Sequence, residues 1–287
     1  MISIGTLVNT DLVTICKAFN EAFAGYFLPI SLTPEQLAEK MRLEQIDLRY
    51  SVGAFENEAL IAFILHGIAE LDGRKLLYNA GTGVLPAARG QQLTRRLYNY
   101  IMPQILEAQI DQVQLEVIDQ NAAAIHNYEG IGFETMRRLH CFKGRPVIDR
   151  GNKEIVISAI DNADWKTLFA FRDFAPSWQN STFVVNTLKE DCLLLGAYEK
   201  DVLVGYLAFN KKSNRLLQLA VAKEYRRRGI GSELCRQLNI DPEQQLIVTN
   251  VDDNPADALH FLQHIGLEEF ICQYEMQLSL TKTANAL

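Results

Sequence analysis

The sequence has no long apolar run and no excess of basic residues, and each shortage argues against a class of protein. No stretch approaches the roughly 18 apolar residues that a membrane-spanning helix needs, and the first residues lack the basic segment and cleavage site of a signal peptide. We therefore expect a cytoplasmic protein with no membrane partner. The formal net charge is -7. Because general nucleic-acid binding rests on a clustered excess of Lys and Arg, we expect no nucleic-acid partner.

Cysteine is also scarce, and its pattern predicts neither a disulfide framework nor a thiolate metal site. The five cysteines are scattered and form no Cys-x-x-Cys pair. His260 and His264 have the i, i+4 spacing used by zinc proteases, but Phe261 stands where those enzymes carry a catalytic Glu. We expect no metal and interpret the histidines as ordinary helix positions.

One segment of the first half recurs in the second half. The copy that begins at Val84 reappears 137 positions later at Val221. Each copy follows an apolar, β-prone run and precedes a helical run and a second apolar strand that leads to an Asn, at Asn121 and Asn254. A period near half the chain length indicates two copies of one domain, because solenoid repeats are much shorter.

The chain length and the order of segments predict two α/β domains. With 287 residues, the chain can bury two separate cores. Each half begins with a strand and a helix, continues with three β-rich runs, and then alternates helix and strand. A polar stretch with Pro and Gly separates the copies. We therefore expect an N-terminal domain over residues 1–146 and a C-terminal domain over residues 152–281.

Each repeated segment turns abruptly from a strand into a helix through an Arg-x-x-Gly-x-Gly pattern or a variant of it. Such a turn exposes several backbone N–H groups, and glycine lets an anion approach them, so it predicts a pyrophosphate site. Gln92 and Thr94 replace the small residues of the pattern in the first copy. The candidate cofactor-binding residues are Val84, Arg89, Gly90, Gln91, Gln92, Leu93, Thr94 and Asn121 in the first copy, and Val221, Arg226, Arg227, Arg228, Gly229, Ile230 and Gly231 in the second.

With the strand, Asn and Gly-Phe or Gly-Leu segments that follow, both halves resemble the GNAT superfamily of N-acetyltransferases. The resemblance implies two tandem domains, each with a mixed, mostly antiparallel central sheet flanked by helices. It also implies acetyl-CoA as co-substrate, with its pyrophosphate on the loop, and direct transfer of the acetyl group to an amine. The acceptor would be a small-molecule amine or a protein amine.

The resemblance also points to candidate catalytic residues in the first copy. The segment from Leu115 to Tyr128 is similar to that of ribosomal-protein alanine N-acetyltransferases, in which a Glu acts as base, usually through water, and a Tyr twelve residues later acts as acid. Those positions are Glu116 and Tyr128 here. In the second copy they are Thr249 and Phe261. We therefore expect an N-terminal catalytic domain and a C-terminal copy that is degenerate in catalytic residues.

Each assignment has an alternative at this stage. The arginines would also suit the solvated start of a helix, and Asn121 would also suit a helix cap. Glu116 lies opposite the buried alternation of its strand, and Tyr128 would also fit a core position. Catalysis in the C-terminal domain and a non-catalytic acyl-CoA sensor or scaffold remain open, as does the choice between a monomer and a homodimer.

Overall fold

The computed structural model describes residues 1–28, 30–71, 73–148, 151–241, 243–254 and 256–280. The chain forms two compact units, which are Met1–Met136 with Glu275–Leu287 (unit 1) and Arg137–Tyr274 (unit 2). Thr281, the expected end of the second domain, lies outside the described residues. Within the described part, no helix is long and apolar enough to cross a membrane.

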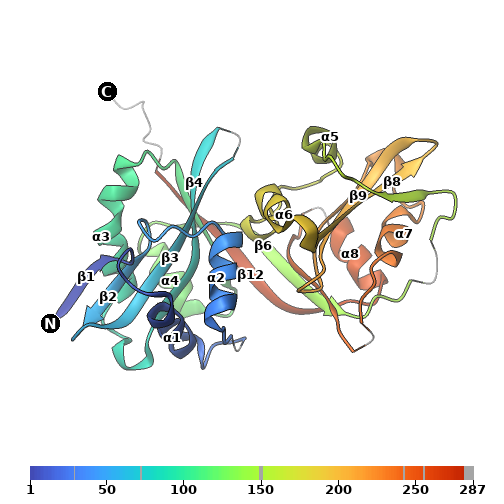
Figure 1. Ribbon diagram of the computed structural model, residues 1–287. Coiled ribbons are helices and arrows are strands. Elements are labelled where there is room, and N and C mark those ends of the chain that lie inside the picture. The colour runs from blue at the N-terminus through green and yellow to red at the C-terminus, as the bar shows by residue number, and fades with distance from the viewer. Residues whose placement is uncertain (29, 72, 149–150, 242, 255, 281–287) are drawn as a thin grey trace. The chain divides into compact units, whose positions relative to one another are not determined.

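Unit 1 begins with helices whose caps the sequence supplies. Asp11 accepts a hydrogen bond from the Thr14 N–H at 2.9 Å, and Thr33 and Gln36 form a reciprocal capping box. The elements of unit 1 in Figure 1 are β1 (Ile2–Thr6), α1 (Leu12–Phe23), α2 (Pro34–Leu43), β2 (Val52–Glu56), β3 (Ala59–Leu71), β4 (Arg74–Val84), α3 (Leu93–Glu107), β5 (Gln112–Ile118) and α4 (Ala122–Glu129).

Unit 2 repeats this order, and its first three helices are shorter than those of unit 1. Its elements are β7 (Val156–Ala159), α5 (Trp165–Phe169), α6 (Thr182–Leu188), β8 (Cys192–Glu199), β9 (Val202–Asn210), β10 (Arg215–Val221), α7 (Ile230–Arg236), β11 (Leu246–Asp252) and α8 (Asp257–His264). Two further strands, β6 (Glu134–Gly144) and β12 (Glu268–Ser279), each have residues in both units.

Both units have a mixed sheet that is mostly antiparallel, as expected. In unit 1 the strand order is β1-β2-β3-β4-β5, in which β4 and β5 are parallel and the other pairs antiparallel. In unit 2 the order is β7-β8-β9-β10-β11, in which β10 and β11 are parallel and the other pairs antiparallel. Each parallel pair is joined through a helix, α3 or α7, as a crossover between parallel strands requires.

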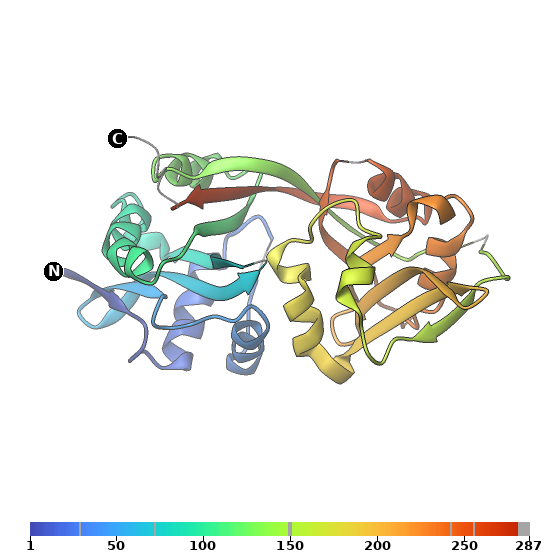
Figure 2. The same cartoon turned by 90° about the horizontal axis from the view of Figure 1, so that it is seen from above.

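Helices cover both faces of each sheet, and the alternation of side chains along a strand supplies both cores. In unit 1, α1 and α2 lie on one face and α3 and α4 on the other (Figure 2). Phe63 and Leu65 of β3 pack in the core under α1. In unit 2, Tyr206 of β9 packs with α5, whereas Leu207 packs in the core that contains α7.

The last strand of each copy does not close the sheet of its own copy. Strand β6 follows the first copy in sequence, yet it pairs antiparallel with β11, with Phe142 opposite Val248. Strand β12 ends the second copy and lies beside β5. The two closing strands are therefore exchanged. The polar stretch at 146–152 separates the repeats in sequence. The boundary between the compact units lies elsewhere: the chain passes from unit 1 to unit 2 between Met136 and Arg137 and returns between Tyr274 and Glu275.

Candidate functional site

A one-residue bulge interrupts the central strand of each unit at the same repeat position. Opposite β3, Gly81 pairs with Leu65 and Asn79 with His66, so Ala80 is the extra residue of β4. The extra residue of β10 is Leu217, between Leu216 and Gln218, and it lies 137 positions after Ala80. A bulge re-aims a strand and often lies beside a functional site.

In each unit the parallel neighbouring strand, β5 or β11, separates from the central strand, β4 or β10, at this bulge. We call the place where the two strands separate the opening of that unit. The register between β4 and β5 ends at Tyr78, and that between β10 and β11 ends at Leu216. Beyond it, the Leu85 N–H donates to Ile61 of β3, and the Ala222 N–H donates to Val204 of β9. Because donors alternate along a strand, the N–H groups of Val84 and Val221, both predicted cofactor-binding residues, face the opening.

The loops that follow have the same backbone conformation in both units. Gly90 and Arg227, which correspond in the repeat, have φ values of 79° and 61°. Gln92 and Gly229, which also correspond, have φ values of 54° and 77°. Each loop therefore has two residues in the left-handed conformation. In unit 1 the first of them is a glycine, Gly90, and in unit 2 the second is a glycine, Gly229. Gln92 departs from the sequence pattern but keeps the path of the loop.

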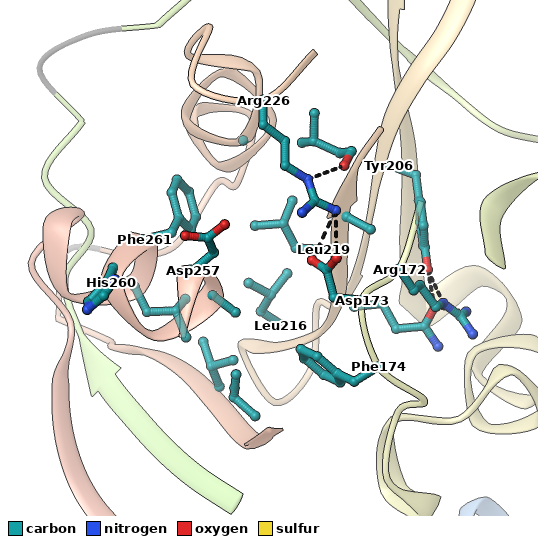
Figure 3. Close-up of a pocket in the computed structure, with 18 of the residues that line it drawn as sticks. Arg172, Asp173, Phe174, Tyr206, Leu216, Leu219, Arg226, Asp257, His260 and Phe261 are labelled. Carbon is teal, nitrogen blue, oxygen red and sulfur yellow. Dashed lines mark hydrogen bonds and ion pairs between the residues drawn. The ribbon is translucent and has the colours of Figure 1, made fainter. Parts of the chain in front are cut away.

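The arginine that opens each loop braces the backbone. The Arg89 side chain donates to the carbonyl of Val84 at 3.4 Å and to that of Ala22 at 3.3 Å. In unit 2, Arg226 donates to the carbonyls of Val221 and Phe171. It also pairs with Asp173 at 3.0 Å, as Figure 3 shows. These contacts hold each loop against its strand and against α1 in unit 1 or the segment after α5 in unit 2, so the side chains support the loop geometry.

The other two arginines of the basic run also have carboxylate partners. Arg228 pairs with Glu199, and Arg227 lies 3.6 Å from Asp257. Both side chains of the Arg227–Asp257 pair are exposed to solvent, so this pair contributes little stability. Ion pairs within unit 2 thus account for a basic run in an acidic chain.

A cavity of about 440 Å³ lies at the opening of unit 2 (Figure 3). Its walls come from β10, β11, α8, the loop that starts at Arg226, and Phe174. Leu216, Leu219 and Phe261 make part of the lining apolar. The volume lies in the range of small-ligand pockets.

A buried polar network borders this cavity, and no sequence motif predicted it. Arg172 donates to the Tyr206 hydroxyl at 2.5 Å and to the Gln218 side chain at 2.6 Å. Its guanidinium also lies 4.1 Å from the centre of the Phe169 ring. Burial raises the pKa of Tyr206, and the charge of Arg172 opposes this effect. Three separate segments supply the network, so no local pattern could have predicted it.

Tyr128 of unit 1 lies at the bulge of β4. The side chain is buried, and its hydroxyl lies near Thr82 and Asn79, which flank the bulge and hydrogen-bond to each other. Burial raises the pKa of Tyr128 to about 12, and the polar side chains of Thr82 and Asn79 act in the opposite direction. A phenol with this pKa remains protonated at neutral pH. Position and protonation both suit a proton donor at the opening.

The matching positions of unit 2 are apolar. Thr82 and Asn79 correspond to Leu219 and Leu216 in the repeat, and Tyr128 corresponds to Phe261 in the motif. All three apolar residues line the cavity. The polar group and its two polar neighbours are therefore present together in one unit and absent together from the other.

Glu116 lies on β5 with its side chain on the face opposite Leu115 and Val117, which are buried. The buried Tyr78 donates a hydrogen bond from its hydroxyl to the Glu116 carboxylate. The side chain is half-buried, so water can reach it. The hydroxyl of Tyr78 thus contacts Glu116, whereas Tyr128 lies near Thr82 and Asn79.

Asn121 is a helix cap and also contacts an aromatic residue. Its side-chain oxygen accepts a hydrogen bond from the Ala124 N–H at 3.2 Å, as the capping interpretation predicts. Its amide donates to the Tyr26 hydroxyl at 3.3 Å. Burial raises the pKa of Tyr26. Tyr26 therefore links the end of α1 to the start of α4.

This geometry agrees with the comparisons with known proteins. The model of the acetyltransferase (GNAT) family matches residues 15–133 and again 157–266. The chain belongs to this family and contains two copies of its domain. Membership supports acyl-CoA-dependent acetyl transfer as the general chemistry of the chain.

Solved structures show the same tandem fold. The chain is similar to a GCN5-related N-acetyltransferase from Sphaerobacter thermophilus, at 15% identity and a TM-score of 0.71, over 97% of this chain and 95% of that one. It is also similar to a tandem GNAT protein from the clavulanic acid biosynthesis pathway, at 12% identity and a TM-score of 0.69, over 97% and 98%. A putative acetyltransferase from Pyrococcus horikoshii aligns at 13% identity and a TM-score of 0.67, over 97% and 89%. A search among curated proteins found no matching relative.

Proposed function

We propose that this protein transfers an acetyl group from acetyl-CoA directly to a primary amine, and that unit 1 performs the chemistry. Tyr128 is the proposed acid, and Glu116 is the proposed base, acting directly or through a water molecule. One observation carries the assignment to unit 1. Tyr128 carries a hydroxyl near the polar side chains of Thr82 and Asn79 at the bulge, whereas the matching positions of unit 2 are all apolar.

The reaction requires two proton transfers. An alkyl amine with a pKa of about 10.4 is mostly protonated at neutral pH, and removal of that proton costs roughly 4 kcal/mol. Glu116 would accept the proton before the amine nitrogen attacks the thioester carbon. The carbon–sulfur bond then breaks, and Tyr128 would donate a proton or a hydrogen bond to the departing thiolate.

Cofactor placement follows from the loop and the opening. The pyrophosphate of acetyl-CoA would bind the backbone N–H groups of Gly90 to Thr94, and the pantetheine arm would extend between β4 and β5. The Val84 N–H would then polarise the thioester carbonyl, because it faces the opening. Much of the rate enhancement would come from holding the amine and thioester in register.

The cavity of unit 2 favours a second candidate function, the binding of an acyl-CoA in unit 2. It lies beside a loop of the same conformation, so unit 2 would also hold the pantetheine arm of an acyl-CoA. Catalysis there would need a proton donor other than Phe261. We therefore propose that unit 2 binds CoA without performing transfer, and the alternative is that it is the catalytic unit.

Two matched substitutions distinguish these candidates. Thr82→Trp would fill the opening of unit 1, and Leu219→Trp at the corresponding position would fill the cavity of unit 2. The assay follows release of free CoA thiol from acetyl-CoA over a panel of small amines and peptides, with product detection by mass spectrometry. We expect Thr82→Trp to abolish transfer and Leu219→Trp to preserve it.

Calorimetric titration with acetyl-CoA supplies the control for binding. Two sites are expected in the parent protein and one in each Trp variant. Loss of transfer only in Leu219→Trp would move catalysis to unit 2. Binding without thiol release for any amine in the panel would overturn the enzyme assignment and favour an acyl-CoA sensor.

A further inference from the structure

Three potential metal ligands of different chemistry converge in unit 2, away from the cavity. They are the imidazole of His140 on β6 and the side chains of Glu269 and Cys272 on β12. One ligand atom from each lies within 4.8 Å of the other two. His140 Nδ1 is 2.5 Å from a Glu269 carboxylate oxygen and 3.4 Å from the Cys272 sulfur. This cluster takes no part in the proposed transfer.

The spacing fits one tetrahedral ion with small adjustments. Zinc lies about 2.0–2.1 Å from nitrogen or oxygen and about 2.3 Å from sulfur, which places tetrahedral ligands roughly 3.3–3.6 Å apart. The distance from His140 Nδ1 to the Cys272 sulfur, 3.4 Å, falls in this range. The Glu269 oxygen would move outward by less than about 1 Å, replacing its hydrogen bond to the imidazole with a bond to the ion. Its side chain is 42% exposed, so this movement is open to it.

The second nitrogen of His140 gives independent support. The residue is only 8% exposed, and Nε2 is a buried polar atom without a hydrogen-bond partner within the described part of the chain. A carboxylate oxygen of Asp253 lies 4.0 Å from it. A histidine that binds metal through one nitrogen usually donates its other N–H to such a carboxylate. A metal on Nδ1 would place the proton on Nε2 and give it an acceptor.

Burial and access also suit a metal site. Cys272 is 4% exposed, so its sulfur is shielded from other thiols, whereas the exposed side of Glu269 provides an entry path. Thiolate, imidazole and carboxylate together favour zinc over the hard cations magnesium and calcium, which prefer oxygen ligands. With three protein ligands, a water molecule would take the fourth position.

We propose that unit 2 binds one Zn²⁺ ion through His140, Glu269 and Cys272. Binding displaces the thiol proton of Cys272, while the His140 proton moves to Nε2 and towards Asp253; no electron is transferred. The ion would fasten β12 to β6, two strands that the chain brings together from distant positions. Because each ligand binds in its deprotonated form, affinity rises with pH.

The ligand set escaped the sequence analysis because His140 is distant from the other two ligands in the sequence. His140 precedes Glu269 by 129 residues and Cys272 by 132. Sequence signatures of zinc sites rely on pairs a few residues apart. The exchange of β6 and β12 between the repeats is what brings these ligands into reach.

The test uses the full chain without an affinity tag, stripped of metal with a chelator. Titration with Co²⁺ serves as the probe, because cobalt bound to thiolate gives a near-ultraviolet charge-transfer band. We expect the band to saturate at one equivalent and to disappear when Zn²⁺ displaces Co²⁺. We also expect Zn²⁺ to raise the melting temperature of the parent protein.

Matched variants identify the ligands. Cys272→Ser should lose the charge-transfer band and bind Zn²⁺ at least tenfold more weakly, and Glu269→Gln should keep the band with reduced affinity. Cys192→Ser, which alters a half-buried thiol elsewhere in the same unit, should behave like the parent. The proposal is overturned if the parent gives no thiolate band, or if the band survives Cys272→Ser, or if Cys192→Ser removes it. Since the parent titration requires no substitution, misfolding of a variant cannot hide a negative result.

Discussion

Replacing Tyr128 with Phe removes one oxygen atom from the proposed catalytic site and leaves its surroundings in place. The ring would keep its burial, 8% exposed, and its edge-on packing against Phe133, whose ring centre is 5.6 Å away. What is lost is the hydroxyl that lies near Thr82 and Asn79 at the bulge. The substitution therefore isolates the proton donor from the packing.

The expected effect on catalysis is larger than the effect on stability. A positioned acid contributes about 10²- to 10⁴-fold, so kcat should fall at least about 100-fold. Removing one buried hydroxyl from polar surroundings should cost no more than about 1–2 kcal/mol of folding free energy. The KM for acetyl-CoA should change by less than about threefold, because the pyrophosphate loop and the Val84 N–H are untouched.

Tyr128 also sets an expected pH profile. Since its pKa is raised to about 12, the phenol is protonated throughout the pH range of ordinary assays. Loss of the Tyr128 proton should therefore cause no fall in kcat between pH 7 and pH 10. A descending limb in this range that Tyr128→Phe removes would show that the phenol ionises much more easily than its burial indicates.

The assay is thiol release at saturating acetyl-CoA, with the best amine from the panel and the melting temperature measured in parallel. Phe261→Tyr is the matched control, because it adds a hydroxyl at the corresponding position of unit 2 and should leave kcat unchanged. An unchanged kcat in Tyr128→Phe would remove Tyr128 from the mechanism. A parallel loss of acetyl-CoA binding would assign it to the cofactor pocket instead.

Three further predictions concern the base, the loops and acid stability. Glu116→Gln should lower kcat strongly at neutral pH and less above the pKa of the amine, about 10.4, where the amine loses its proton unaided; an equal loss at every pH would contradict a base role. Gly90→Ala and Gly229→Ala both place an alanine in the left-handed conformation, but the new Cβ meets no neighbouring atom within 4 Å at residue 90 and lies 3.3 Å from Gly151 at residue 229. Gly229→Ala should therefore lower the free energy of unfolding by about 1 kcal/mol or more beyond Gly90→Ala, as measured by urea unfolding. Burial lowers the pKa of His66 to about 4, so the unfolded chain takes up the His66 proton before the folded chain as the pH falls. The stabilisation from the neutral His66 is complete above about pH 6.5 and is lost towards pH 4, about 3 kcal/mol in all. The melting temperature of His66→Gln should therefore depend less on pH over this interval than that of the parent protein.

The sequence alone determined the features that depend on neighbouring residues. The strand, turn and helix around Arg226 and Gly229 follow one another within about ten residues, so their pattern and its duplicate near Arg89 predict two α/β domains of the acetyltransferase family. The same locality allowed Glu116 and Tyr128 to be identified as a spaced pair.

Tertiary structure decided everything that joins distant positions. Sequence spacing could not show that Arg226 braces a strand carbonyl, that Tyr128 lies near Thr82 and Asn79, or that Gln92 takes the left-handed conformation of Gly229. The exchange of β6 and β12 was equally hidden, because a strand can pair with any edge that offers matching hydrogen bonds. These contacts are set by the packing of the whole sheet, and the site therefore depends on the fold more than on its motifs.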